Sequence, residues 1–184
     1  INEVLAQNAT TLIVAGATPD LIELHNAGAA PLDLGGLGLT DNQASPYKFV
    51  FPAGTTLPAG GYLVLTADNL SGGPYLHTGF TLKADGDDLS LFDAASRGGA
   101  LLDAVTFGVQ VPDFSIGRRT DGSWGLCRPT FGAPNEAVRT GPTGTLRINE
   151  WLADAQFVAR NDFVELYNPD SLPVELGGLW LSDA

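Results

Sequence analysis

An internal repeat constrains the fold of this chain more than any other feature of its sequence. Three blocks recur in the same order and are identical at 16 of 24 positions. They are Ile1–Ala6 with Ile148–Ala153, Asp20–Asn26 with Asp162–Asn168, and Pro31–Asp41 with Pro173–Asp183. Because a recurring sequence predicts a recurring structural unit, the fold of the first part must also suit the C-terminal part.

The spacing of the blocks divides the chain. Ile148 lies 147 residues after Ile1, whereas the two later blocks recur 142 residues apart. The difference between these distances falls before Asp20, where a surface loop can absorb it. We predict a complete unit over residues 1–135, a linker over residues 136–145, and the N-terminal portion of a second, truncated copy over residues 146–184.

The composition, and the turn-forming residues between short apolar runs, favour β-structure. The 184 residues include 23 glycines and 12 prolines, which the interiors of helices tolerate poorly. Short runs of β-forming residues, such as Tyr62–Leu65, Leu89–Phe92 and Ala104–Phe107, are separated by Gly, Pro, Asn or Asp. Short strands about a dozen residues apart predict an all-β chain built as an antiparallel β-sandwich.

The charge of the chain bears on its partners and location. Acidic residues outnumber basic residues by 21 to 9, which gives a net charge of −12. Phosphate backbones are bound mainly through Lys and Arg, so a chain with the single basic pair Arg118-Arg119 is not expected to bind nucleic acid. No apolar run is long enough to cross a membrane, so we expect no membrane insertion. An acidic chain suits an extracellular or cell-surface setting, where calcium is plentiful.

Three further features concern the covalent state of the chain. The single cysteine, Cys127, cannot form an internal disulfide, and we expect it in the core. The sequence begins at Ile1, contains no methionine and carries no signal peptide. We interpret it as a segment of a longer or processed protein.

Several motifs in the first unit, together with the repeated blocks, resemble a known family. These motifs are Phe51–Thr55, Gly61–Val64, Asp113–Arg118, Asp121–Trp124 and Pro129–Asn135. In this order they resemble the bacterial lamin-tail domain, over residues 1–135 in full and over residues 146–184 as the first third of a second copy. The resemblance implies an immunoglobulin-like β-sandwich without catalytic residues, of the kind found in nuclear lamins and in bacterial secreted or surface proteins. In bacteria it implies frequent attachment to hydrolases such as nucleases and phosphatases.

The two histidines are the first candidates for catalysis. His25 recurs as Tyr167, and a position that accepts Tyr favours a packing role over a catalytic one. His77 lies in a stretch rich in Gly and Pro and is interpreted as a loop residue. The sequence contains no nucleophile elbow, P-loop, His-Glu-x-x-His or dinucleotide fingerprint. We therefore predict no enzyme activity and no catalytic or cofactor-binding residues.

Two acidic groups are candidates for a cation site. Asp85, Asp87 and Asp88 could bind calcium, but an EF-hand would need a ligand and a glycine where Leu89 and Ser90 stand, so a hairpin turn is favoured. Polar residues also recur in both copies, as Asn2, Glu3 and Glu23 and as Asn149, Glu150 and Glu165. We favour a structural role for them, in which their oxygens accept hydrogen bonds from the backbone. We predict no metal or cofactor, with calcium as the alternative left open.

The C-terminal part should need a partner. About forty residues with about three strands rarely build a core alone, and their edges would be exposed. We expect residues 146–184 to dock on a sheet of the first unit or on another chain, or to replace residues 1–41 in a neighbour's sandwich. Trp180 faces Gly38 in the other copy, and Trp124, Trp151 and Trp180 are interpreted as packing or interface residues.

These observations support two functions. The first is a non-catalytic interaction or spacer module of a secreted or cell-surface bacterial protein, with a protein partner or self-association through residues 146–184. The alternative is an accessory domain that binds a carbohydrate or another ligand for an attached hydrolase, and an exposed line of aromatic residues would support it.

Overall fold

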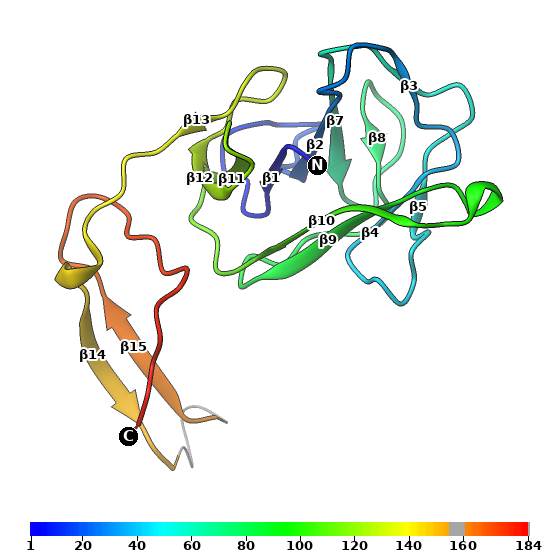
Figure 1. Ribbon diagram of the computed structural model, residues 1–184. Helices are drawn as coiled ribbons and strands as arrows, with labels where there is room; N and C mark the ends of the chain where they lie inside the picture. Colours follow the sequence, from blue (N-terminus) through cyan, green and yellow to red (C-terminus); the bar gives the residue numbers. More distant parts are fainter. Residues whose placement is uncertain (155–160, 184) are drawn as a thin grey trace. The chain divides into compact units, whose positions relative to one another are not determined.

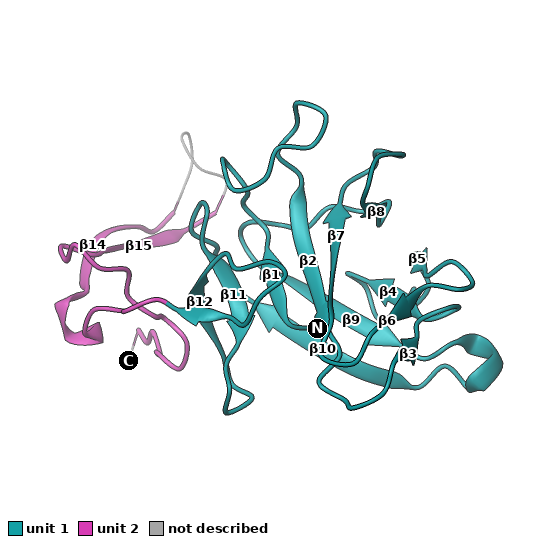
Figure 2. Cartoon of the chain, turned by 90° about the horizontal axis from the view of Figure 1, so that it is seen from above, with its two compact units in different colours: residues 1–137 teal, residues 138–184 magenta. Residues whose placement is uncertain are grey.

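The computed structural model describes residues 1–154 and 161–183, and it divides into two compact units, Ile1–Ala137 and Val138–Ala184 (Figure 1; Figure 2). Apart from two short 3-10 helices, Ala95–Arg97 and Thr143–Thr145, the regular elements among the described residues are strands. No helix in the described part of the chain is long and apolar enough to cross a membrane. The all-β prediction is confirmed.

Unit 1 contains two larger antiparallel sheets and a short strand pair. The first sheet has the order β13-β12-β11-β1-β2-β7-β8, in which only β7 and β8 run parallel. Its strands are β1 (Glu3–Leu5), β2 (Asp20–His25), β7 (Tyr62–Ala67), β8 (Leu76–His77), β11 (Ser115–Arg118), β12 (Trp124–Arg128) and β13 (Glu136–Ala137). The second sheet, β10-β9-β4-β5, consists of β4 (Gly38–Thr40), β5 (Phe49–Val50), β9 (Asp87–Phe92) and β10 (Leu101–Phe107). The pair is β3 (Leu32–Asp33) with β6 (Thr56–Leu57).

The core of unit 1 combines apolar side chains from both sheets. Val4 and Ile22 come from β1 and β2, and Leu39, Leu89 and Val105 come from the second sheet. In strands, successive side chains point to opposite faces, so an alternating strand supplies one set to this core. This is the antiparallel sandwich that the sequence predicts.

The described part of unit 2 contains one strand pair, β14 (Arg147–Leu152) with β15 (Phe163–Tyr167). Its register matches that of β1 and β2 in unit 1. Trp151 pairs with Val164 as Val4 pairs with Ile22, and the next pair along the strands also corresponds. The aligned repeats thus form the same hairpin.

The chain after each hairpin also follows one local pattern. The side-chain amide of Asn26 donates to the carbonyl oxygen of the residue four positions later at 2.8 Å, and that of Asn168 does the same at 2.9 Å. Gly36 and Gly178, at the next turn, have φ values of 81° and 80°, a region in which only glycine is unstrained. The two segments therefore have the same turn chemistry.

The two segments part where β4 begins in unit 1. β4 is paired on one side with β5 and on the other with β9. The corresponding residues 180–182 form no strand in unit 2, whose described part has two strands and not the three expected from the sequence. A strand needs a neighbour for its backbone hydrogen bonds, and none of the described residues of unit 2 forms such a neighbour at this position.

Candidate functional site: an open groove on unit 2

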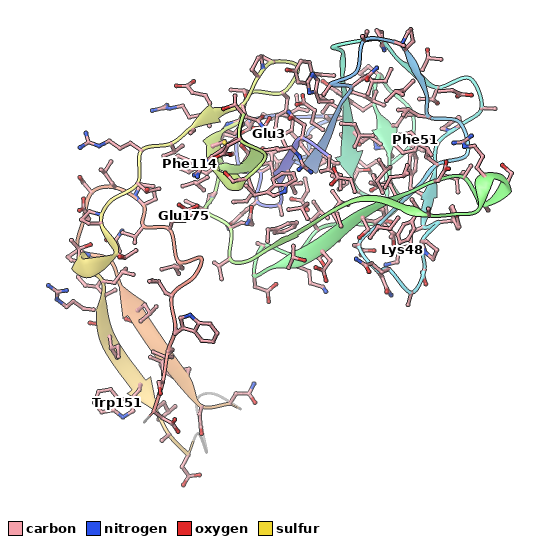
Figure 3. All side chains as sticks on the ribbon, viewed as in Figure 1. Glu3, Lys48, Phe51, Phe114, Trp151 and Glu175 are labelled. Carbon is pink, nitrogen blue, oxygen red and sulfur yellow. The ribbon has the colours of Figure 1, made fainter. Side chains whose placement is uncertain are left out.

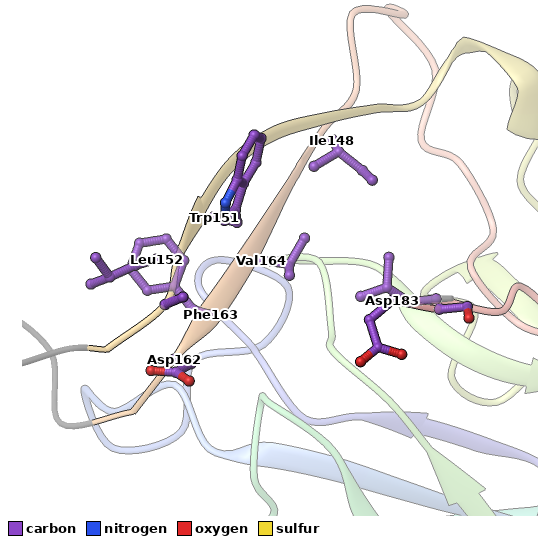
Figure 4. A pocket seen from close by; sticks show the side chains of 10 residues that line it. Ile148, Trp151, Leu152, Asp162, Phe163, Val164 and Asp183 are labelled. Carbon is purple, nitrogen blue, oxygen red and sulfur yellow. The ribbon is translucent and has the colours of Figure 1, made fainter.

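A groove with a volume of about 930 Å³ opens on unit 2 beside the β14–β15 hairpin (Figure 4). Both strands and the C-terminal segment contribute side chains to it. The lining residues are Ile148, Trp151, Leu152, Ala153, Asp162, Phe163, Val164, Leu181, Ser182 and Asp183. The wall is mostly apolar, and it carries a carboxylate at Asp162 and another at Asp183.

The groove corresponds to part of the core of unit 1. Trp151 is 70 % exposed, whereas its counterpart Val4 is fully buried. Phe163 and Leu181 are also exposed, while Leu21 and Leu39 in the same places of the repeat are fully buried. Unit 2 therefore presents to solvent the side chains that a sandwich of this type encloses.

The strand edges of unit 2 are open as well. In unit 1, β1 is flanked by β2 and β11, and β2 is flanked by β1 and β7. In the described part of unit 2, β14 and β15 pair only with each other. Unpaired edges present backbone N–H and C=O groups that can accept a further strand.

The polar residues that recur in the repeated sequence blocks have different surroundings in the two units. In unit 1 the carboxylate of Glu3 accepts hydrogen bonds from the Ser115 hydroxyl at 2.5 Å and from the Thr130 backbone N–H at 3.1 Å. Burial raises the pKa of Glu3 to about 7, against these hydrogen bonds, which favour the charged form. Glu3, which is labelled in Figure 3, thus links the segment that begins at Thr130 to β1.

Glu23 has a matching role. Its carboxylate accepts a hydrogen bond from the Asn2 side chain at 2.7 Å and another from the Gly132 backbone N–H at 2.5 Å. Burial also raises the pKa of Glu23. The hydrogen-bond donors to Glu3 and Glu23 are thus a side-chain amide, a side-chain hydroxyl and two backbone N–H groups of unit 1.

In unit 2 only part of this network is present. The side chain of Asn149 donates to the carboxylate of Glu165, as Asn2 does to Glu23. Glu150 and Glu165 are exposed, whereas Glu3 and Glu23 are fully buried. Unit 2 thus repeats the hydrogen bond between the Asn and Glu side chains. The segment of unit 1 that contains Thr130 and Gly132 has no equivalent among the described residues of unit 2.

The histidines contact structural groups. The two ring nitrogens of His77 lie 2.6 Å from Asp68 Oδ1 and 2.7 Å from the Gly72 carbonyl oxygen. The hydrogen bond to Gly72, followed by that to Asp68, raises the pKa of His77. His25 stacks on Tyr62 with ring centroids 4.3 Å apart. His77 therefore holds the loop between β7 and β8, and His25 packs on the surface of the sheet.

The acidic loop, residues 85–88, runs from the turn at Gly86 into the first two residues of β9. One oxygen of Asp87 accepts the Lys83 backbone N–H at 3.1 Å, and Asp88 accepts the Thr106 hydroxyl. Asp85 precedes Gly86, whose φ of 127° suits glycine. Among the described residues, no group of three or more His, Cys, Asp or Glu side chains is arranged to hold a metal ion.

The remaining candidates lie in unit 1 and pack there. Cys127 is buried, and burial raises the pKa of its thiol. The guanidinium of Arg118 makes two 2.8 Å hydrogen bonds to Asp103 and lies over the Trp124 ring, 4.6 Å from its centroid. One member of the basic pair is thereby engaged within the domain.

The sequence indicated the groove only indirectly. It predicted that residues 146–184 need a partner, but it did not single out Phe163, Val164 or Leu181 as lining residues. The signal was available in the repeat, because these residues align with Leu21, Ile22 and Leu39 of the first copy. Their exposure could not be predicted, since it depends on strands that lie outside the repeated blocks.

Comparison with known proteins identifies one family. The family model described as Lamin Tail Domain matches residues 1–108. No curated protein and no solved structure matches the chain.

Proposed function

We propose that this chain, which belongs to the lamin tail domain family, is a non-catalytic module that acts through protein–protein contacts. The family is one of immunoglobulin-like domains without catalytic activity, and its model covers more than half of the chain. We place the module in a secreted or cell-surface bacterial protein. The acidic net charge of −12 supports that setting.

Residues 146–184 are, in this proposal, the N-terminal portion of a second lamin tail domain. The shared hairpin register supports it, because Trp151 pairs with Val164 as Val4 pairs with Ile22. The exposed pair Asn149–Glu165, which repeats the buried pair Asn2–Glu23, supports it as well.

The groove carries the protein-contact function. Burial of a Val, Leu, Ile or Phe side chain contributes about 1.5–3 kcal/mol, and the groove exposes several such side chains together. Contiguous exposed apolar surface with open strand edges is typical of a site where another polypeptide binds. Self-association through this surface can be tested with the purified chain, without a second protein.

Light scattering on a sizing column tests self-association over a range of concentrations. We expect a mass of about twice 19.2 kDa, and Trp151→Asp should return the chain to a monomer because it places a charge in the groove. Ile13→Asp is the matched control, since Ile13 is an exposed apolar residue of unit 1. A wild-type mass of 19.2 kDa at every concentration would contradict self-association.

A second candidate function rests on the aromatic residues of unit 2. Trp151, Phe163, Tyr167 and Trp180 are all exposed, and aromatic faces can stack on sugar rings. In this case unit 2 is an accessory site for a carbohydrate polymer. Titration with a soluble glucan, monitored by tryptophan fluorescence, should then saturate in the wild type and fail in Trp151→Ala. A flat titration of a monomeric wild type counts against the carbohydrate function.

A further inference from the structure

Gly38 lies at a position of unit 1 where the surrounding atoms leave no room for a side chain. It lies in β4, paired with Val50 on one side and with Phe92 on the other. A Cβ atom added at Gly38 would lie 2.5 Å from Cδ1 of Tyr47 and closer still to the carbonyl oxygen of Pro46. Real Cβ atoms do not approach other heavy atoms so closely, so this position excludes every side chain in the present backbone.

The groups around Gly38 are fixed. The Tyr47 hydroxyl donates a 2.9 Å hydrogen bond to the carbonyl oxygen of Asp93, which holds the ring in place. The obstacle at Pro46 is a backbone atom, which cannot rotate away as the end of a flexible side chain can. A larger residue at position 38 would therefore have to displace the loop over β4.

The second copy has a tryptophan at this position. Trp180 aligns with Gly38, and its side chain is 97 % exposed in unit 2. At two other positions the second copy also has the larger side chain, because Trp151 aligns with Val4 and Phe163 aligns with Leu21. Val4 and Leu21 are fully buried, and because protein interiors are close-packed, larger side chains at these positions would overpack the core.

We propose that Trp180, supported by Trp151 and Phe163, prevents the second repeat from taking the place of residues 1–41 in unit 1. The second repeat then cannot replace the first, either in its own chain or in another molecule of the protein. This inference goes beyond the contact function, since it needs no partner and rests only on the second-copy assignment within that proposal.

Such a barrier answers a specific hazard of similar tandem repeats. Neighbouring domains of similar sequence can misassemble by exchanging equivalent segments while they fold. The polar residues do not distinguish the two repeats. Asn149 and Glu165 are identical to Asn2 and Glu23, which form a hydrogen bond in unit 1. The two repeats therefore differ in side-chain size at these three positions, besides the different length of the segment before Asp20 and Asp162.

Hydrogen–deuterium exchange of the full chain, refolded from urea and read by mass spectrometry, tests the barrier. The peptides that cover β2 and β15 differ in sequence, so each repeat is followed separately. We expect one slowly exchanging population for β2 in the wild type. In the triple variant Trp151→Val, Phe163→Leu and Trp180→Gly, we expect β2 to split into a slow and a fast population, with new protection in β15.

The variant Trp180→Phe is the control, because it keeps a large ring at the position and should leave β2 in one population. Two β2 populations in the wild type, a single population in the triple variant, or a split in Trp180→Phe would each overturn the proposal. The mass of the wild type in light scattering reports on self-association separately. Failure of the contact function can therefore be told apart from failure of the barrier.

Discussion

The hydroxyl of Ser115 donates a 2.5 Å hydrogen bond to the carboxylate of Glu3, which lies 112 residues earlier in the chain. Both side chains are fully buried where β1 and β11 run side by side. This contact, with the hydrogen bond from Thr130 to Glu3, joins the beginning of unit 1 to its last strands.

Glu3 should make the stability of unit 1 depend on pH. Its pKa rises from the ordinary 4.5 to about 7 in the folded state, so between these values the folded chain binds more protons than the unfolded chain. Stability from this group is therefore complete below about pH 4.5 and falls by about 3 kcal/mol as the pH rises through 7.

The variant Glu3→Gln, which cannot titrate, checks this prediction. We measure the free energy of unfolding in urea for the variant and for the wild type, on the acidic side of pH 4.5 and on the alkaline side of pH 7. The variant's value minus the wild-type value should be larger at the higher pH. A difference between variant and wild type that is the same at both pH values would refute the assignment.

The glutamates at equivalent positions should differ in their importance. Glu23→Ala leaves the Gly132 backbone N–H and the Asn2 amide without their buried partner, which should cost about 1–3 kcal/mol. Glu165→Ala removes an exposed side chain and should change the free energy of unfolding by less than about 0.5 kcal/mol. Urea unfolding of both variants measures the difference, and equal effects would contradict the environments described for the two units.

Gly38 should not tolerate even one added carbon. We expect Gly38→Ala to destabilise unit 1 by about 1–3 kcal/mol, because the loop at Pro46 and Tyr47 must shift. Gly108→Ala is the matched control, since a Cβ there meets nothing within 4 Å. Thermal unfolding compares the two, and a fully stable Gly38→Ala protein would show that the loop yields easily.

His77 should hold the loop between β7 and β8 more firmly at low pH. Its hydrogen bonds to Gly72 and Asp68 raise its pKa, so its contribution is complete below the ordinary value of 6.5 and is lost as the pH rises through the raised value. We expect amide exchange in residues 69–76 to accelerate across this range in the wild type. In His77→Gln the same amides should lose this dependence once the intrinsic effect of pH on exchange is removed.

Calcium should leave the stability of the chain unchanged. The carboxylates of Asp87 and Asp88 accept hydrogen bonds from protein groups, and those of Glu3 and Glu23 do so inside unit 1. We expect the same Tm with and without millimolar calcium. A higher Tm that disappears in Asp87→Asn would instead establish a calcium site in the acidic loop.

Part of the architecture could be predicted from local patterns. Period-two alternation and frequent Gly and Pro predict the all-β sandwich, and the order of motifs indicates the family. The described part of residues 146–184 has two strands where the sequence predicts about three, because residues 180–182 have no described counterparts of the two strands that flank β4. Strand propensity is local, whereas pairing depends on segments far away in the sequence.

The repeat determined by itself that Val4 and Trp151, and likewise Gly38 and Trp180, hold equivalent positions. Only the tertiary structure decided that Val4 is buried and Trp151 exposed, and that the loop at Pro46 and Tyr47 closes over Gly38. The physical reason is that alternation along a strand fixes which side chains share a face. Whether that face is covered depends on strands and loops contributed by distant parts of the chain.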